Sequence, residues 1–426
     1  MENLLNDDRV PLVQVQVGLG WPRQENFSLS IRFLSLRGIG SPKIEKKFFT
    51  FFRRRDNEER TERTEEFGTM ADVEKLERYV LKNDKGVEVH VRPLGCLIQR
   101  LILPDQKGNK TDVVLGFEKL IPYTDSSISP YFGVVVGRVA NRIEGGKFEV
   151  EGASFQVSLN ENGNCLHGGQ VGFDKAVWDV ASYEEGKAVT LKHVSPDGDQ
   201  GFPGEVETKV EYRLSEPSDS DNGLLLVQMS ATTTKPTPIS LAQHSYFNLK
   251  GHNSGSDVLN HHLYLNASHY TSVDASLIPT GNLVPTEGTP FHFPESGVRI
   301  GEHIAEVEGG FDHNFVLDQS VKRELDSRLK VGSTPLHLAA VLEDRESGRK
   351  VELSTSAPGV QFYSGNFLDG SITSAQSSKD GATYNKHGGL CLETQGFPNA
   401  VNQSNFPSNV LKPGEAYSHT MVYKFA

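Results

Sequence analysis

The stretch YSHTMVYKF, residues 417–425, alternates large, mostly apolar side chains with smaller or more polar ones along its whole length. A period of two is typical of a β-strand with one covered face, because successive side chains point to opposite sides of a sheet. The two sets of positions are Tyr417, His419, Met421, Tyr423 and Phe425, and Ser418, Thr420, Val422 and Lys424. The stretch therefore predicts a half-buried strand.

The sequence upstream of this strand repeats the pattern in short segments. From Met70 onward, apolar runs are separated by Gly, Pro, Asn and Asp about every ten residues. Further strands are expected at 94–104, 131–140, 223–234, 261–268 and 351–367, and the modest helix candidates are 75–82 and 300–307. Many strands with few helices predict an all-β fold, a large antiparallel β-sandwich or barrel, rather than a parallel sheet.

The first 69 residues differ from the rest of the chain. They hold 12 basic and 11 acidic side chains, many of them in the run FFRRRDNEERTERTEEFG. Such a charge run favours solvation over core packing. We expect residues 1–69 to form a poorly ordered extension and residues 70–426 to form one β domain. An organelle transit peptide is the alternative for the extension, although its many acids argue against it.

Composition and charge narrow the classes of ligand. The 426 residues are 36% hydrophobic and 23% charged, with a formal net charge of −12. This balance disfavours nucleic acid and anionic membranes as partners and fits a neutral small molecule. The three cysteines, Cys96, Cys165 and Cys391, lack metal-ligand spacing, and no apolar run reaches the roughly 18 residues of a membrane span. We expect a cytoplasmic protein with reduced thiols.

A second stretch, GGLCLETQGFPNA at 388–400, bears on function. Glu393 directly follows the apolar run Leu390–Leu392, which itself resembles a strand entering a core. Burying a carboxylate without a partner costs several kcal/mol. Glu393 is therefore a candidate functional residue.

Five other stretches place polar side chains in strand-like surroundings. Alone, each has a structural explanation: a surface ion pair for Arg142, a turn for His167 or Asp312, a core position for His244, and a cross-strand hydrogen bond for Gln361. The stretches are GRVANRI with Asn141 and Arg142, NCLHGG with His167, LAQHSYFNL with His244, GFDHNF with Asp312, and VQFYSGNF with Gln361.

Motifs for metals and cofactors are absent from the sequence. His167, His244 and Asp312, or the pair His261 and His262, offer metal-ligand types, but no HExxH-like spacing supports a metal site. Neither a nucleotide-binding glycine motif nor G-x-S-x-G occurs. The sequence predicts no metal and no cofactor.

Taken together and in order, these stretches resemble the aldose 1-epimerase family, the galactose mutarotases. The resemblance covers nearly all of residues 71–426 and includes SLIPTG (276–281) and CLETQGFPNAVNQSNFP (391–407). It implies a galactose mutarotase-like supersandwich with an open, polar sugar cleft and no cofactor. The implied activity is the interconversion of α and β anomers of free aldohexoses such as galactose and glucose.

The resemblance also implies roles for individual residues. Glu393 would be the general base and His244 the general acid. The sugar hydroxyls would be surrounded by Asn141, Arg142, His167, Ser245, Tyr246, Asp312 and Gln361. Two departures are visible: Gln243 stands where the family usually has Asn, and Asn399 stands where Asp is more common. We expect the second to affect only a turn.

Three other functions fit parts of the pattern. A glycoside hydrolase would use Glu393 and Asp312 as paired carboxylates. A non-catalytic sugar-binding module would need neither proton-transfer residue, and a phosphosugar epimerase would need more cationic groups than Arg142 alone. We expect a monosaccharide substrate and a monomer or weak dimer. Galactose and glucose differ at one hydroxyl, so the preferred aldose stays open.

Overall fold

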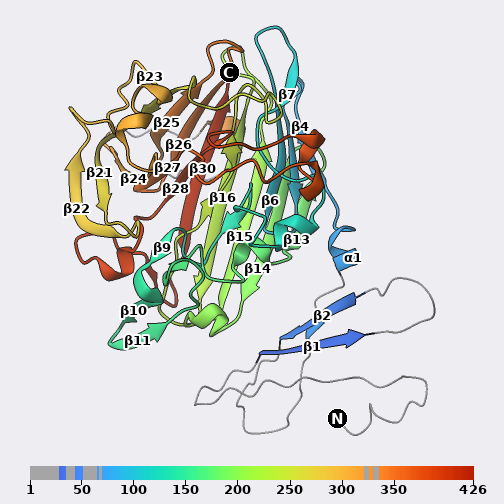
Figure 1. The fold of residues 1–426 in the computed structure, drawn as a ribbon, viewed down its shortest axis with the longest axis vertical. Coiled ribbons are helices and arrows are strands. Elements are labelled where there is room, and N and C mark those ends of the chain that lie inside the picture. The colour runs from blue at the N-terminus through green and yellow to red at the C-terminus, as the bar shows by residue number, and fades with distance from the viewer. Residues whose placement is uncertain (1–27, 35–43, 51–64, 67–69, 321–325, 330–334) are drawn as a thin grey trace, which may run out of the picture. The chain divides into compact units, whose positions relative to one another are not determined.

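The computed structural model describes residues 28–34, 44–50, 65–66, 70–320, 326–329 and 335–426 (Figure 1). The chain divides into two units, Met1–Lys75 and Leu76–Ala426. The first unit contains a three-stranded antiparallel sheet of β1 (Ser28–Leu34), β2 (Ile44–Thr50) and β3 (Glu65–Glu66), followed by α1 (Met70–Val73). Most of the predicted poorly ordered extension lies outside the described residues, so that expectation stays a prediction.

The largest element of the second unit is a nine-stranded antiparallel sheet. Its central strand, β30 (Tyr417–Phe425), is the stretch that opened the sequence analysis, and it pairs with β16 on one side and β26 on the other. In spatial order the strands are β13 (Asp179–Glu184), β14 (Ala188–Ser195), β15 (Val206–Leu214), β16 (Gly223–Thr233), β30, β26 (Lys350–Thr355), β25 (His337–Glu343), β20 (His262–Leu265) and β23 (Val298–Arg299).

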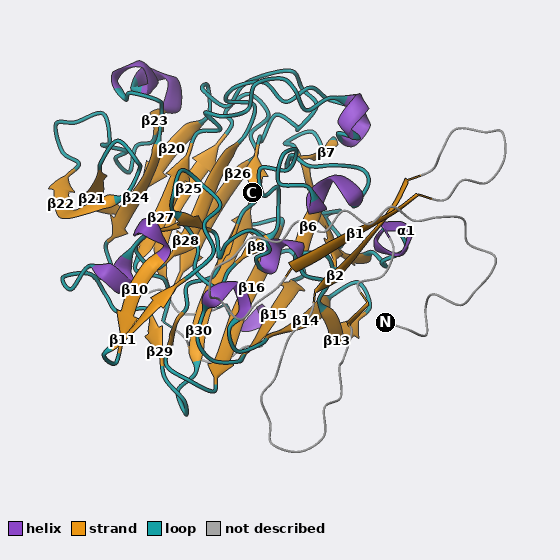
Figure 2. Cartoon of the chain, turned by 60° about the horizontal axis from the view of Figure 1, so that its bottom comes forward, coloured by secondary structure: helices purple, strands orange, loops and turns teal. Residues whose placement is uncertain are grey.

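Two smaller antiparallel sheets pack with it. The six-stranded sheet has the order β19 (Tyr246–Phe247), β28 (Leu390–Gln395), β27 (Gly359–Tyr363), β24 (Asp312–Leu317), β21 (Ala267–Val273) and β22 (Pro279–Pro285). The four-stranded sheet has the order β4 (Tyr79–Lys82), β5 (Glu88–Arg92), β6 (Leu97–Pro104) and β7 (Lys110–Asp112). Figure 2 shows strands throughout this unit, with short helices in the connections. The prediction of a large antiparallel β-sandwich is confirmed.

The alternation in β30 sets which residues enter the core. Met421, Tyr423 and Phe425 are fully buried in one cluster that also contains Phe362 and Leu392 from the six-stranded sheet. Burial of apolar area at roughly 25 cal/mol per Å² makes this interior the main source of stability. Val422, on the opposite face, is buried in a smaller cluster with Leu224, Leu226, Leu329 and Leu336. Both faces of β30 are therefore covered.

Several sequence expectations need correction. The segment 131–140 contains only a two-residue strand, β8 (Val135–Val136), because its backbone groups bond to several separate segments instead of one strand. The helix candidate 75–82 forms β4, and the candidate 300–307 forms only short 3₁₀ turns. The predicted strand 351–367 is two strands, β26 and β27, separated by a turn.

The remaining elements are short. The strands are β9 (Arg142–Ile143), β10 (Lys147–Val150), β11 (Ala153–Gln156), β12 (Cys165–Leu166), β17 (Thr237–Pro238), β18 (Ala242–Gln243) and β29 (Val410–Leu411). The 3₁₀ helices are η2 (Ile121–Thr124), η3 (Glu144–Gly146), η4 (Phe173–Lys175), η5 (Asp199–Gly201), η6 (Ile300–Glu302), η7 (Ile304–Glu306), η8 (Ser327–Leu329), η9 (Ser374–Gln376), η10 (Lys379–Gly381) and η11 (Ala400–Asn402). Among the described residues, no helix has the length and apolarity to cross a membrane.

Candidate active site

One face of the six-stranded sheet carries three of the predicted site residues, Asp312, Gln361 and Glu393, in two rows. Tyr363 pairs in register with Cys391 on one side and Asp312 on the other. In the next row, Gln361 pairs with Glu393. Residues paired in register share a face, and so do residues two apart on one strand. The antiparallel register thus gathers residues that lie up to 81 positions apart in the sequence.

His244 reaches this face from the connection between β18 and β19. Its N–H donates to Val134 O at 2.9 Å, and its carbonyl accepts from Gly133 N at 2.9 Å. The side chain of Gln243 steadies the same connection, because it donates to Gly133 O at 2.8 Å and accepts from Ser245 N at 3.0 Å. Gln243, which stands where the family usually has Asn, therefore still supplies a side-chain amide, and this amide bonds to the backbone on both sides of the His244 connection.

His244 and Glu393 form the central contact of the site. Nε2 of His244 lies 3.5 Å from Oε2 of Glu393, and both side chains are buried. Burial lowers the pKa of His244 to about 4. Burial also raises the pKa of Glu393 well above its usual value; the charge of Asp312 adds to this, and Arg142 opposes it. These directions favour a neutral pair that holds one proton, because burial penalises the charged forms of both groups.

Arg142 and Asp312 form a charged cluster beside this pair. The Arg142 guanidinium donates to both carboxylate oxygens of Glu161, at 3.2 and 3.1 Å, and lies 3.7 Å from Asp312 Oδ2. Asp312 Oδ1 accepts from Gln361 Nε2 at 2.7 Å. Burial raises the pKa of Asp312, although Arg142 and the Gln361 hydrogen bond pull it down. Gln361 Oε1 and Glu393 Oε2 are buried and have no hydrogen-bond partner among the described residues.

His167 has a fixed proton position. Its Nδ1 accepts from the backbone N–H of Asn141 at 3.1 Å. Burial, with help from neighbouring cationic groups, lowers its pKa well below the usual value, so the ring is neutral and its hydrogen is on Nε2. Gly168 follows with a positive φ of 91°, and a Cβ there would collide with Gly137 O. The glycine allows His167 to be held against this backbone.

The two residues after His244 differ in their placement. The Tyr246 ring stacks on His244 with centroids 5.2 Å apart, and its hydroxyl donates to Pro130 O at 2.9 Å. Tyr246 therefore supports the imidazole. Ser245 alternates with these two residues along the chain, and its buried Oγ has no hydrogen-bond partner among the described residues. The structure brings Ser245 near the site without joining its side chain to the other site residues.

Two neighbours of the site, Glu161 and Tyr131, escaped the sequence analysis, and a third, Asn399, was expected to affect only a turn. Glu161 holds Arg142 but sits in the turn-like stretch NENGN, which resembles an ordinary loop. Tyr131 packs edge-on against His167 with centroids 4.6 Å apart, from a segment expected to be a strand. Asn399 is buried, its N–H donates to Arg142 O at 2.9 Å, and its side chain accepts from Glu144 N at 3.1 Å. The departure at Asn399 therefore supports the Arg142 backbone as well as a turn.

A metal ion does not fit this cluster. His167, His244 and Glu393 place one donor atom each within 4.8 Å of one another. Metal-bound histidines normally donate their second ring N–H to an acceptor. Nδ1 of His167 instead accepts an N–H, so its other nitrogen carries the hydrogen and offers no lone pair. Asp312, which the sequence suggested as a ligand, is not part of the group.

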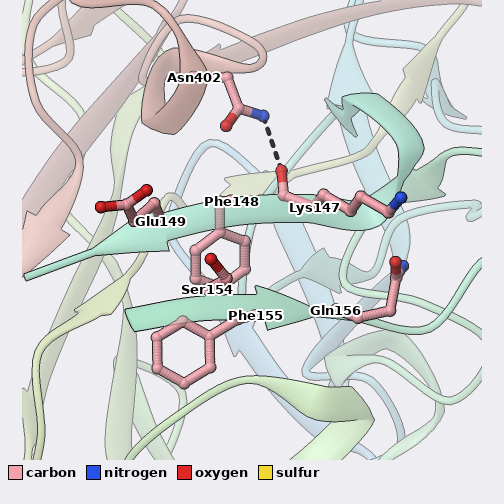
Figure 3. A pocket seen from close by; sticks show the side chains of 7 residues that line it. All are labelled: Lys147, Phe148, Glu149, Ser154, Phe155, Gln156 and Asn402. Carbon is pink, nitrogen blue, oxygen red and sulfur yellow. Dashed lines mark hydrogen bonds between the residues drawn. The ribbon is translucent and has the colours of Figure 1, made fainter. Parts of the chain in front are cut away.

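A surface hollow of about 420 Å³ lies apart from these residues (Figure 3). It is formed by the β10–β11 hairpin, where the Phe148 and Phe155 rings stack at 5.4 Å, and by Asn402, which donates to Lys147 O at 2.9 Å. None of the predicted site residues lines it. The hollow therefore lacks the residues that the sequence analysis assigned to acid–base chemistry, His244 and Glu393.

Sequence comparisons identify relatives of this chain. The family model for aldose 1-epimerase matches residues 77–424. Galactose mutarotase from Homo sapiens is 42% identical over 352 residues, which cover 82% of this chain and 94% of that protein. Aldose 1-epimerase from Escherichia coli (strain K12) is 32% identical over 351 residues, which cover 81% and 94%.

Solved structures show the same fold. The crystal structure of a GalM/aldose epimerase homologue from C. elegans matches with a TM-score of 0.70 at 27% identity, covering 82% of this chain and 99% of that one. The galactose 1-epimerase from Lactobacillus acidophilus matches with a TM-score of 0.65 at 25% identity, covering 90% and 99%. Every predicted site residue lies within the span of the family model. The chain therefore belongs to the aldose 1-epimerase family.

Proposed function

We propose that this protein interconverts the α and β anomers of free aldohexoses such as galactose and glucose, with Glu393 as general base and His244 as general acid. The observation that carries the proposal is the contact of 3.5 Å between His244 Nε2 and Glu393 Oε2. A base and an acid this close can both reach the C1 and O5 region of one sugar ring.

The reaction needs two proton movements. Glu393 takes the proton of the C1 hydroxyl while His244 Nε2 gives one to the ring oxygen, and the C1–O5 bond breaks to leave the open-chain aldehyde. Rotation about C1–C2 and return of both protons close the ring as the other anomer. A positioned acid and base can each contribute on the order of 10²- to 10⁴-fold.

The reaction also depends on which member of the His244–Glu393 pair carries their one proton. Burial favours a protonated Glu393 beside a neutral His244, which is the state left after ring opening. The pyranose reacts with the opposite distribution, a carboxylate and an imidazolium. The short distance between the two groups allows one proton to change sides. Sugar hydroxyls that donate to the carboxylate would favour the reactive distribution.

Several atoms around the pair are ready to bind hydroxyls. Gln361 Oε1 and Glu393 Oε2 are buried acceptors without a partner among the described residues. A buried polar atom left unpaired costs about 1–3 kcal/mol, so a hydroxyl-rich ligand would relieve this cost. Arg142 and Asp312 offer charged groups, which bind hydroxyls more strongly than neutral ones do. His167 offers Nε2–H as a fixed donor. Asn141, Ser245 and Tyr246 remain predicted neighbours of the sugar.

Polarimetry on freshly dissolved α-D-glucose and α-D-galactose tests the proposal. We expect Glu393→Gln and His244→Asn each to reduce kcat by at least about 100-fold, the lower range for a lost acid or base. Glu185→Gln, at an exposed turn residue, serves as the control and should keep wild-type activity. Equilibration by both site variants at the wild-type rate would contradict the assignment.

The other candidate functions are less favoured. In a glycoside hydrolase Asp312 would be the second catalytic carboxylate, but here it is engaged by Gln361 and Arg142. A non-catalytic module would not need the buried acid–base contact, which its desolvation makes costly. Rates on glucose and glucose 6-phosphate, and the release of monosaccharide from oligosaccharides, separate these functions from mutarotation.

The cytoplasmic location and the monomeric or weakly dimeric state remain predictions from the sequence. The proposed partner is a small monosaccharide, with no nucleic acid and no membrane, which the net charge of −12 supports. Light scattering coupled to size-exclusion chromatography at several protein concentrations tests the oligomeric state.

A further inference from the structure

The thiol of Cys391 contacts His244, the proposed general acid, at Nδ1, the ring nitrogen that does not face Glu393. Cys391 lies on β28 two residues before Glu393, so the two side chains share a face. Its Sγ is 3.6 Å from Nδ1 of His244, and both side chains are buried. The imidazole is therefore held between a thiol at Nδ1 and a carboxyl group at Nε2.

The chemistry of the thiol sets the direction of this hydrogen bond. Burial raises the pKa of Cys391 well above its usual value, so the sulfur keeps its hydrogen. The Tyr246 hydroxyl also neighbours the thiol, and its own hydrogen is donated to Pro130 O. The Tyr246 oxygen can therefore accept the S–H, which leaves the sulfur to act as a weak acceptor for Nδ1–H of His244. The hydrogen of the neutral imidazole then belongs on Nδ1, and Nε2 is free to take the proton of Glu393 and deliver it to the ring oxygen.

We propose that Cys391 is a positioning residue for the epimerase reaction: its sulfur accepts from Nδ1–H of His244 and keeps Nε2 directed at Glu393 and the reacting sugar oxygen, free to take a proton and deliver it. This inference rests on the function proposed above for His244. It adds a residue that touches neither the sugar nor the base.

A thiol at this position differs from the carboxylate that orients many catalytic histidines. A carboxylate at Nδ1 stabilises the imidazolium and so makes the histidine a weaker acid. A neutral thiol fixes the tautomer without adding charge, and once the imidazolium forms, the sulfur can act only as a weak acceptor. His244 is thus oriented while its charged form stays poorly stabilised. Proton delivery to the weakly basic ring oxygen needs a strong acid of this kind.

The test uses the full chain labelled with ¹⁵N-histidine and the variants Cys391→Ala and Cys391→Ser. The His244 signals are assigned by their loss in His244→Asn. We expect wild type to show a protonated Nδ1 and an unprotonated Nε2 at neutral pH, Cys391→Ser to keep this tautomer, and Cys391→Ala to show a mixture. Cys96→Ala removes another buried thiol, distant in sequence, and serves as the control.

Kinetics supply the second readout. Cys391→Ala should lower kcat roughly 10-fold with KM within about two-fold, because orientation of the acid is lost and sugar binding is not. Cys391→Ser should recover most of kcat, and Cys96→Ala should match wild type. An unprotonated Nδ1 in wild type, or full kcat in Cys391→Ala, would overturn the proposal. If wild type itself does not speed mutarotation, the proposed function fails, and the ¹⁵N signals still decide the Cys391 contact.

Discussion

The buried carboxyl group of Glu393 is balanced by neighbours of opposite effect. Asp312 raises its pKa and Arg142 lowers it, while burial is the largest cause of the rise. Arg142 also contacts the carboxylates of Glu161 and Asp312. These negative charges offset much of its positive charge, so Arg142 lowers the pKa of Glu393 only partly. Glu393 therefore keeps the raised proton affinity that a base needs to accept a hydroxyl proton.

The pH dependence of catalysis follows from these shifts. The pair reacts when it holds one proton, so activity is lost in acid when both groups are protonated and in alkali when neither is. Because burial lowers the pKa of His244 to about 4, the acid limb of kcat/KM should fall near pH 4. The alkaline limb should fall above the usual range of a carboxyl group. Polarimetry between about pH 3 and 10, corrected for buffer catalysis, measures both limbs. An acid limb near pH 6.5, the ordinary histidine value, would contradict the pKa direction.

At the scale of elements, a short turn rather than a strand holds the guanidinium of Arg142. Glu161 and Asn164 close this turn by mutual backbone hydrogen bonds of 3.2 and 2.7 Å, and Glu161 then takes the Arg142 guanidinium in a two-point contact. Two parallel hydrogen bonds fix the plane of a guanidinium more strictly than one can. The turn thus sets the direction in which Arg142 faces Asp312.

Glu161→Gln tests this arrangement. The neutral amide can accept at only one oxygen, so Arg142 should lose its fixed orientation while His244 and Glu393 keep theirs. We expect KM for galactose to rise roughly 3- to 10-fold with kcat within about three-fold, the pattern of weakened binding that is equal in ground and transition states. Steady-state polarimetry with Glu185→Gln as control measures the split. A fall in kcat without a change in KM would place Glu161 in the chemical step instead.

The polar loop 370–386 is anchored to the four-stranded sheet by a buried lysine. Nζ of Lys379 donates to Asp112 Oδ2 at 2.7 Å and to the carbonyls of Gln99 and Val114 at 2.8 and 2.6 Å. The side chain is completely buried. All three ammonium hydrogens therefore have acceptors, which is the condition for burying a charge at tolerable cost.

Lys379→Met should destabilise the fold by about 3 kcal/mol, because it removes a buried ammonium and leaves Asp112 Oδ2 with its 3.4 Å contact to Arg100. Lys386→Met, at an exposed position of the same loop, should stay within about 0.5 kcal/mol of wild type. Urea unfolding followed by tryptophan fluorescence measures both. Equal midpoints for the two variants would show that the buried contact contributes little.

The sequence predicted elements best where one local rule decided the outcome. The alternation in 417–425 gave the central strand, and the charge after an apolar run identified Glu393. The prediction of one strand over 131–140 was wrong. An apolar run does not reveal that its backbone groups bond to Gly95 and His244 rather than to one neighbouring strand. Glu161 stayed hidden because its role depends on a distant arginine, and no local pattern records such a contact.

At the scale of the whole molecule, the site is assembled from segments spread over residues 141–393, all within the second unit. The match to the aldose 1-epimerase family begins at residue 77. The described contacts that orient His244, Glu393 and Arg142 come from residues of the second unit. The described site therefore has its supporting contacts within Leu76–Ala426.

A chain that begins at Met70 should consequently keep both fold and activity. We expect kcat and KM for galactose within about two-fold of the full chain, because the residues proposed to meet the sugar and the sheets that carry them lie after Met70. The unfolding midpoint should also be close to that of the full chain, since the described members of the large buried cluster begin at Tyr79. Polarimetry and thermal unfolding on the two chains, with the inactive Glu393→Gln form of each as a blank, measure these quantities. A shortened chain that folds but loses kcat would show that residues 1–69 act on the site, whereas one that fails to fold would give them a structural role.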